Sequence, residues 1–199
     1  FPWFMNANMA SIMPQVVAAW GQQQGHQVTF VCYTGFENLL QELPADVDLV
    51  FISCFTEAAQ TAYALSSLFR SRGAITALGG PHARCFPQDA TRFFDYVFGF
   101  TNKEVMHAVL AECAQHRPRG IQVSAPSQPH ELPGVQERWP FLAQVMAKAP
   151  FLKIVPMIGS LGCPYTCSFC IDSTVPYQPL EFNLLKSDLR FLLTKYRRP

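Results

Sequence analysis

The chain has 199 residues, of which 49% are hydrophobic and 15% charged, and its formal net charge is +1. This composition is typical of a folded core and excludes a disordered chain. The low net charge gives no electrostatic reason to expect a nucleic acid or an anionic membrane as partner. No apolar run reaches the roughly 18–20 residues that span a bilayer, and the first residues lack the basic segment of a signal peptide.

Seven cysteines are present. An odd number without the spacing of a disulfide framework predicts a reducing compartment, and we expect the cytoplasm. Cys32, Cys54 and Cys113 fall in apolar segments, where the simplest interpretation is a small buried hydrophobe. Cys85 follows a Gly-Gly-Pro-His sequence and is harder to place. The other three form a compact motif: Cys163, Cys167 and Cys170.

Helical and strand-like segments alternate through residues 1–116. Apolar residues recur at helical spacing from Met9 to Trp20 and predict a first helix. Thr101 and Glu104 form a capping-box pair that predicts the start of a later one. We expect further helices at 36–43, 58–69, 87–93 and 101–115, and strands at 27–33, 48–54, 74–78 and 96–98.

This alternation predicts a flavodoxin-like (Rossmann-type) α/β fold, a doubly wound parallel sheet covered by helices, for residues 1–116. Such a sheet normally has five strands with the first at its centre. Only four are predicted and none precedes the first helix, so we expect the missing strand upstream of Phe1. Residues 117–150 carry six prolines and little periodicity, and we expect a linker with a short helix at 141–147.

A second domain is predicted for residues 151–199. Residues 151–158 have strand-like character despite Pro156. Residues 159–179 form a long loop that carries the three cysteines, and Leu185–Tyr196 has the pattern of an amphipathic helix. Strand, loop and helix make one β/α unit, whereas a whole β/α barrel takes about 250 residues. We therefore expect only the first unit of a truncated barrel.

The cysteine motif runs Gly162-Cys163-Pro164-Tyr165-Thr166-Cys167-Ser168-Phe169-Cys170, with the spacing C-x3-C-x2-C. Three thiolates can each bind one iron of a cubane cluster and leave the fourth iron open to a substrate. The alternative is structural zinc, which usually takes four ligands, often as two separated C-x2-C pairs. No second pair follows here, and the nearest histidine is His130.

The motif resembles that of the radical S-adenosylmethionine family in its spacing, its Gly-Cys-Pro lead-in, its aromatic Phe169 and its place after a predicted strand. The resemblance implies a 4Fe–4S cluster on Cys163, Cys167 and Cys170 whose open iron binds S-adenosylmethionine. It implies reductive cleavage to a 5′-deoxyadenosyl radical, with an electron from a donor such as flavodoxin or ferredoxin. It also implies that Phe169 packs near the adenine, although plain loop packing explains this residue equally well.

The preceding domain resembles that of the cobalamin-dependent subfamily in the segments Leu78-Gly-Gly-Pro-His82 and Asp95-Tyr-Val-Phe-Gly99. Ligands of doubly wound sheets bind at the carboxyl ends of the strands. No Asp-x-His sequence occurs in the chain, so either the cobalt has no protein histidine ligand or the domain has lost the cofactor. A simple turn at the two glycines is the structural alternative. The resemblance implies a cobalamin face made of Phe55, Thr56, Gly79, Gly80, Pro81 and His82.

The expected function is therefore that of an enzyme that acts on a small-molecule or peptide substrate. Methyl transfer to an unactivated carbon is the first expectation, and a carbon-skeleton rearrangement is the second. Without the rest of a barrel to shield a radical, we do not expect this chain alone to turn over. Two alternatives come from other classes: a cobalamin or small-ligand binding module with a vestigial barrel, and a zinc-stabilised interaction domain.

Overall fold

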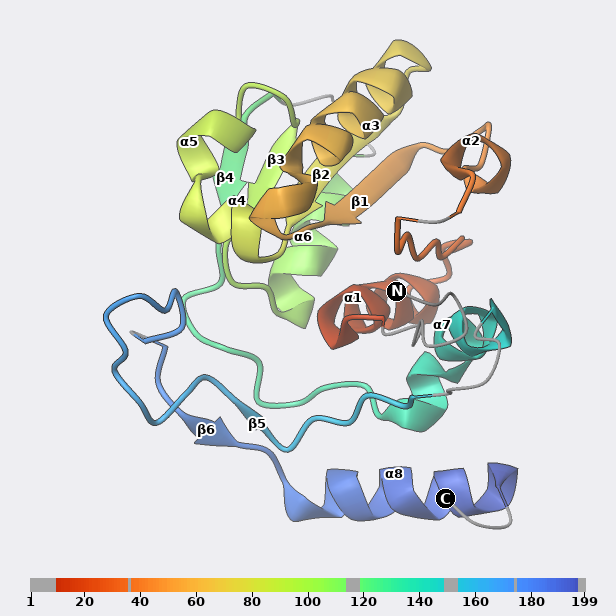
Figure 1. The fold of residues 1–199 in the computed structure, drawn as a ribbon, viewed down its shortest axis with the longest axis vertical. Coiled ribbons are helices and arrows are strands. Elements are labelled where there is room, and N and C mark those ends of the chain that lie inside the picture. The colour runs from red at the N-terminus through yellow and green to blue at the C-terminus, as the bar shows by residue number, and fades with distance from the viewer. Residues whose placement is uncertain (1–9, 36, 114–118, 149–153, 174, 197–199) are drawn as a thin grey trace. The chain divides into compact units, whose positions relative to one another are not determined.

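The computed structural model of the protein describes residues 10–35, 37–113, 119–148, 154–173 and 175–196 (Figure 1). The chain divides into two compact units. The first, here called the sheet unit, comprises Pro44–Pro129 and Tyr165–Thr174. The second, here called the helical unit, comprises Phe1–Leu43, His130–Pro164 and Val175–Pro199.

Within the described residues, four parallel strands form the sheet of the sheet unit, in the order β1-β2-β3-β4. Ser53, the last residue of β1, pairs with Gly79, the last residue of β2. Phe98 and Val123 pair in the same way at the ends of β3 and β4. The carboxyl ends of the strands therefore meet along one edge, where ligands of such sheets bind. The strands are β1 (Leu49–Ser53), β2 (Ile75–Gly79), β3 (Tyr96–Phe98) and β4 (Ile121–Val123).

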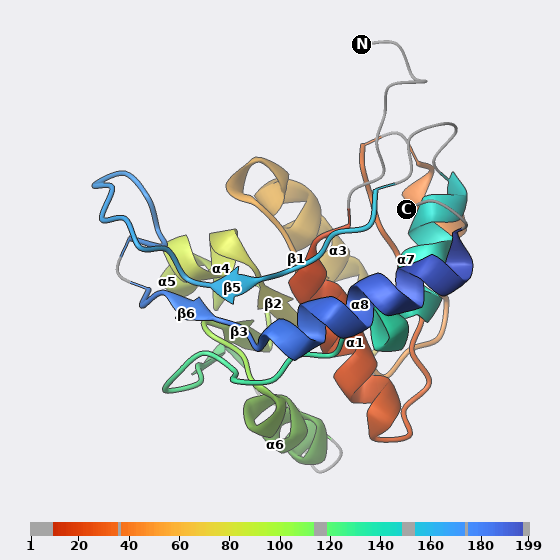
Figure 2. The same cartoon turned by 90° about the horizontal axis from the view of Figure 1, so that it is seen from below.

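Helices cover both faces of this sheet. Leu78 packs in one apolar cluster with Tyr63 of α3, whereas its neighbour Ala77 packs in another with Val109 of α6. Successive strand residues point to opposite faces, so α3 and α6 lie on opposite sides, as Figures 1 and 2 show. The predicted α/β fold is confirmed and is compatible with a Rossmann-like fold. The helices are α3 (Ala59–Ser71), α4 (Pro81–Cys85), α5 (Pro87–Ala90) and α6 (Lys103–Cys113), with the 3-10 helix η2 (Thr56–Ala58) before α3.

Asp95 joins several parts of the sheet unit. Its fully buried carboxylate accepts hydrogen bonds from the Thr76 backbone N–H at 2.9 Å and from the Thr76 hydroxyl at 3.2 Å. Arg70 of α3 approaches the same carboxylate at 3.6 Å. The Asp95 carbonyl accepts from the N–H of Ile121 at the start of β4. One residue therefore links β2, β4 and α3 next to the start of β3.

The helical unit is built around Arg138, which is fully buried. Its guanidinium donates to Gln15 Oε1 at 2.9 Å and to the carbonyls of Pro133 and Pro156. Burial lowers the pKa of Arg138, while the nearby charge of Asp188 acts in the opposite direction. Helix α7 packs against both α1 and α8 (Figure 2). The elements are α1 (Ile12–Gln23), α2 (Leu39–Glu42), α7 (Val135–Lys148), α8 (Phe182–Lys195) and the antiparallel pair β5 (Ser160–Leu161) and β6 (Gln178–Pro179).

The predicted strand at 27–33 is wrong, because the described chain has no strand there. This segment belongs to the helical unit, where Val28 and Phe30 pack against Ala18, Ala19 and Phe141. Its apolar residues thus pack against helices rather than within a sheet. The predicted strand at 151–158 is also wrong for residues 154–158, and residues 151–153 lie outside the described chain.

The predicted linker at 117–150 holds two regular elements, β4 and the 14-residue helix α7. Pro140 lies inside α7, although an interior proline costs about 3 kcal/mol. The helix persists because Val135, Leu142 and Met146 bury their side chains in a cluster with Leu192 of α8. Tertiary packing therefore outweighs the local preference.

The predicted capping box at the start of α6 is wrong as well. Asn102 takes this role, since its Oδ1 accepts the N–H of Val105 at 2.9 Å. The buried Thr101 hydroxyl finds no hydrogen-bond partner within the described chain.

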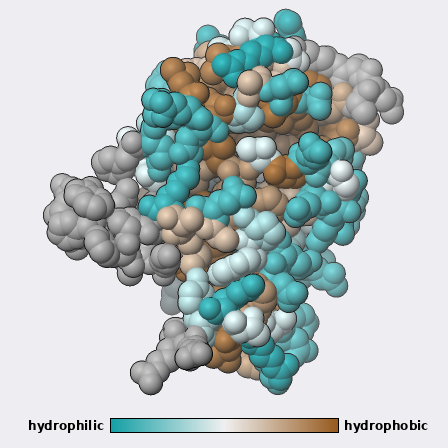
Figure 3. All heavy atoms as spheres, turned by 90° about the vertical axis from the view of Figure 1, so that its right-hand side faces the viewer, coloured by the Kyte–Doolittle hydropathy of each residue, from teal (hydrophilic) through white to brown (hydrophobic). Residues whose placement is uncertain are grey.

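None of the described helices combines the length and apolar character that crossing a membrane requires. On the face drawn in Figure 3, hydrophobic and hydrophilic residues are interspersed.

Replacing Asp95 with alanine should lower the free energy of unfolding by about 3 kcal/mol, because it leaves the buried Thr76 N–H without its acceptor. Urea unfolding followed by circular dichroism measures this loss. Asp46→Ala, at an exposed position in the same unit, is the control and should change stability by less than about 0.5 kcal/mol. Equal effects of the two substitutions would contradict the linking role of Asp95.

Candidate functional site

The carboxyl edge of β1 and β2 brings together two of the predicted cofactor segments. The His82 N–H donates to the Cys54 carbonyl at 3.2 Å. Gly80 has a φ of +87°, and a Cβ added there would lie 2.7 Å from Ser53 Oγ and 3.1 Å from the backbone N and O of Cys54. Only glycine fits this position, and the packing of the chain against itself is the reason.

The predicted cobalamin residues lie together at this edge but differ in exposure. The Phe55 side chain is 60% exposed, and Thr56 is exposed too. Gly79, Gly80 and Pro81 are partly buried. His82 is buried. The edge therefore offers an exposed aromatic ring and partly exposed backbone to a ligand.

The His82 ring is engaged on both nitrogens. Nε2 lies 2.7 Å from the Tyr63 hydroxyl, and Nδ1 lies 3.3 Å from Thr56 Oγ1. The Tyr63 hydroxyl donates to Asp89 Oδ2 at 2.8 Å, so its oxygen can accept a hydrogen bond from His82 Nε2–H. This pattern assigns the proton to Nε2 and makes Nδ1 the acceptor from Thr56. His82 thus connects the sheet edge to α3 and α5.

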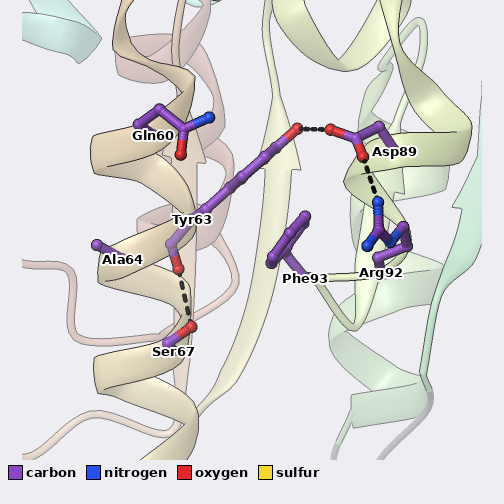
Figure 4. A pocket seen from close by; sticks show the side chains of 7 residues that line it. All are labelled: Gln60, Tyr63, Ala64, Ser67, Asp89, Arg92 and Phe93. Carbon is purple, nitrogen blue, oxygen red and sulfur yellow. Dashed lines mark hydrogen bonds and ion pairs between the residues drawn. The ribbon is translucent and has the colours of Figure 1, made fainter.

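Tyr63 and Asp89 were not singled out by the sequence, because nothing local marks them. Figure 4 shows both side chains at a shallow pocket on the sheet unit. Burial, followed by the hydrogen bond to Asp89, raises the pKa of Tyr63 to about 12. Tyr63 therefore remains a hydrogen-bond donor throughout the physiological pH range. The pocket has a volume of about 450 Å³ and is lined by Gln60, Tyr63, Ala64, Ser67, Asp89, Arg92 and Phe93.

The cysteine loop is closed at its base by β5 and β6. The Leu180 N–H donates to the Gly159 carbonyl at 3.0 Å. Gly162 has a φ of +67°, and a side chain there would overlap the carbonyl of Pro176. The glycine that precedes Cys163 is therefore required by the hairpin itself, whether or not a cofactor binds.

Two consecutive turns form the second half of the loop, which belongs to the sheet unit. The Cys170 N–H donates to the Cys167 carbonyl, and the Ser173 N–H donates to the Cys170 carbonyl, both at 3.1 Å. A turn brings its first and fourth Cα atoms within about 7 Å, so Cys167 and Cys170 lie on one turn. Cys163 belongs to the helical unit.

The chemistry of the three motif cysteines fits iron–sulfur ligation. All three are free thiols; Cys167 is exposed, and Cys163 and Cys170 are partly buried. The neighbouring Phe169 is 91% exposed. Across the described residues, no three His, Cys, Asp or Glu side chains are gathered so that they could hold a metal ion. The ligand set Cys163, Cys167 and Cys170 therefore stays a prediction from the spacing, and the cobalamin face stays a prediction from the resemblance.

The remaining cysteines differ from one another. Cys54 is buried, as the sequence predicts, and burial raises its pKa to about 11. Cys32 and Cys113 are only partly buried, although burial raises the pKa of each. Cys85 is exposed and lies outside the motif, which makes it a useful control thiol.

No family model matches the chain. The bacteriochlorophyllide d C-8(2)-methyltransferase of Chlorobaculum tepidum is 29% identical over 132 residues, which are 63% of this chain and 28% of that enzyme. The chain has a distant methyltransferase homologue. It spans less than a third of the length of that relative.

One solved structure, the N-terminal domain of a hypothetical protein from Thermotoga maritima, matches 63% of this chain and 97% of that chain. Its sequence identity is 18% and its TM-score is 0.37.

Replacing Gly80 with alanine should lower the free energy of unfolding by about 2 kcal/mol. The new Cβ would clash with Ser53 Oγ, and the positive φ at this position is unfavourable for any residue with a side chain. Gly79→Ala is the matched control, since its Cβ would meet only Phe98 Cβ at 3.9 Å. Urea midpoints and slopes for both variants measure the difference. Comparable losses would show that the close approach at Gly80 is not what restricts this position.

Proposed function

We propose that the chain is part of a radical S-adenosylmethionine enzyme that transfers a methyl group, with a 4Fe–4S cluster on Cys163, Cys167 and Cys170. The observation that carries the proposal is the C-x3-C-x2-C motif. The distant methyltransferase homologue supports the reaction class. Free thiols, two of them on one turn, support the ligand assignment.

Different residues of the loop would bind the cluster and S-adenosylmethionine. Three thiolates leave one iron open, and the bound cluster would supply one electron for the cleavage of S-adenosylmethionine. Gly162 allows the chain to enter the loop in its left-handed conformation. The exposed Phe169 ring next to Cys170 offers a surface on which an adenine can stack.

We also propose that the edge formed by Phe55, Thr56 and the Gly79–His82 segment binds cobalamin, which would relay the methyl group. The exposed Phe55 ring supports a flat apolar ligand there. Both nitrogens of His82 have hydrogen-bond partners, which agrees with a cobalt that has no protein histidine ligand. Gly80 adds no support, because the contact with Cys54 already accounts for a glycine at this position.

A binding module without turnover is the second candidate. It is favoured by residues 154–158, which are not a strand although the first strand of a barrel was expected there. This candidate keeps the cobalamin face and predicts no cleavage of S-adenosylmethionine.

Anaerobic reconstitution of the purified protein with iron and sulfide should give brown iron–sulfur absorption and about four iron atoms per chain. Cys167→Ala should abolish most of this absorption, because it removes one of three ligands. Cys85→Ala, which changes another exposed thiol, is the control and should retain it. Colourless protein with one zinc per chain would sink the cluster assignment, as would unchanged iron in Cys167→Ala.

Titration with hydroxocobalamin should give saturable binding that Phe55→Ala weakens about tenfold, since it removes the exposed aromatic surface at the sheet edge. Phe182→Ala is the control, because Phe182 is 73% exposed but lies on α8 of the helical unit. Changes in the visible spectrum of the cobalamin report the binding. Binding that is absent, or that responds equally to both substitutions, would overturn the cobalamin face while leaving the cluster assignment intact.

A further inference from the structure

Arg84 connects α4 to the cysteine loop. It lies two residues after His82. Its Nη1 donates to Asp172 Oδ1 at 2.7 Å, and its Nη2 donates to the Ile171 carbonyl at 3.3 Å. These acceptors directly follow Cys170 in the chain, and all of these residues belong to the sheet unit.

The guanidinium of Arg84 is also held from the side of the sheet. Its Cζ lies 4.6 Å from the centroid of the Phe100 ring. Phe100 is fixed in turn, because its N–H donates to Ser124 Oγ and its carbonyl accepts from the Ala125 N–H at 2.8 Å. A planar guanidinium can stack on a ring and donate in two directions at once, which a lysine cannot do.

This arrangement differs from an ordinary surface ion pair, which contributes little. The Arg92–Asp89 pair joins residues three apart, with side chains 71% and 46% exposed. Asp172 is as exposed as Asp89, at 47%, but the Arg84 side chain is only 20% exposed and its contact spans 88 residues of sequence. It binds a carboxylate, a backbone carbonyl and an aromatic ring together.

We propose that Arg84 is a positioning residue for the cysteine loop. It holds the turn that carries Cys167 and Cys170 against the sheet unit by binding Ile171 and Asp172. The effect on iron rests on the proposed function, whereas the bracing of the loop is a property of the metal-free protein. Arg84 therefore fixes the predicted cluster loop to the same helix that begins at the predicted cobalamin face.

Loss of Arg84 should affect the position of the turn more than its internal shape. The hydrogen bonds from the Cys170 and Ser173 N–H groups are made within the loop and do not involve Arg84. An Arg84→Gln protein should therefore still assemble a cluster, but the loop should open more often and release iron faster.

Hydrogen exchange of the metal-free protein tests the bracing. Peptides covering residues 165–173 should exchange about fivefold faster in Arg84→Gln and in Asp172→Asn than in the wild type. The double variant should be no faster than Arg84→Gln alone, because Arg84→Gln already removes the contact with Asp172. Arg92→Gln is the matched control and should leave these peptides unchanged. Exchange at the wild-type rate in Arg84→Gln would overturn the proposal.

Iron release to a chelator tests the consequence for the cluster. Reconstituted Arg84→Gln and Asp172→Asn should lose iron about fivefold faster than the wild type and the Arg92→Gln control. The release rate of Arg84→Lys should fall between those of the wild type and Arg84→Gln, because lysine keeps the positive charge but lacks the planar guanidinium that donates to two acceptors. Wild-type release rates despite faster exchange would overturn the positioning role. If the wild-type protein binds no cluster, the proposed function fails, and the exchange experiment still decides the bracing.

Discussion

The candidate site depends on the close approach of Gly80 to the end of β1. With no side chain at this position, the chain passes over Cys54, and His82 donates its N–H to the Cys54 carbonyl. Helix α4 therefore begins at Pro81, directly beside the paired ends of β1 and β2. Because His82 and Arg84 both lie on α4, the start of this helix fixes the positions of the buried His82 ring and of the Arg84 guanidinium. A side chain at position 80 would displace the segment from which both of them extend.

The sheet edge separates two kinds of chemistry. Thr56, His82, Tyr63 and Asp89 form a continuous chain of hydrogen bonds that joins η2, α3, α4 and α5, with His82 and Tyr63 buried and Thr56 exposed. Because each member has a partner, these groups stabilise the edge rather than offer themselves to a ligand. The ring of Phe55, in contrast, is exposed. A ligand at this edge would therefore contact the apolar ring of Phe55, whereas the nearby polar side chains are already engaged in hydrogen bonds with one another.

Much of the sheet can be predicted because its strands are short apolar runs, as at 48–54 and 74–78, and their parallel order places Ser53 beside Gly79. The cysteine motif is likewise a local signal. The segment at 27–33 misleads because its apolar residues pack on Phe141 instead of pairing with a strand. Strand β4 is missed because its three residues are only partly buried and lie in the proline-rich segment 117–150. The contacts of His82 with Tyr63 and of Arg84 with Asp172 span 19 and 88 residues. No local pattern encodes such contacts, because they depend on the completed fold.

The long span of the Arg84–Asp172 contact has a consequence for the order of folding. The hairpin that closes the cysteine loop joins residues close in sequence, such as Gly159 and Leu180, and local contacts cost little loop-closure entropy. The docking of the loop, in contrast, needs a finished surface on residues Pro44–Pro129. During synthesis this stretch is made before Cys167, and domains generally fold in order from the N-terminus. The newly made loop would thus meet a folded receiving surface, and its thiols would spend little time in an unanchored chain.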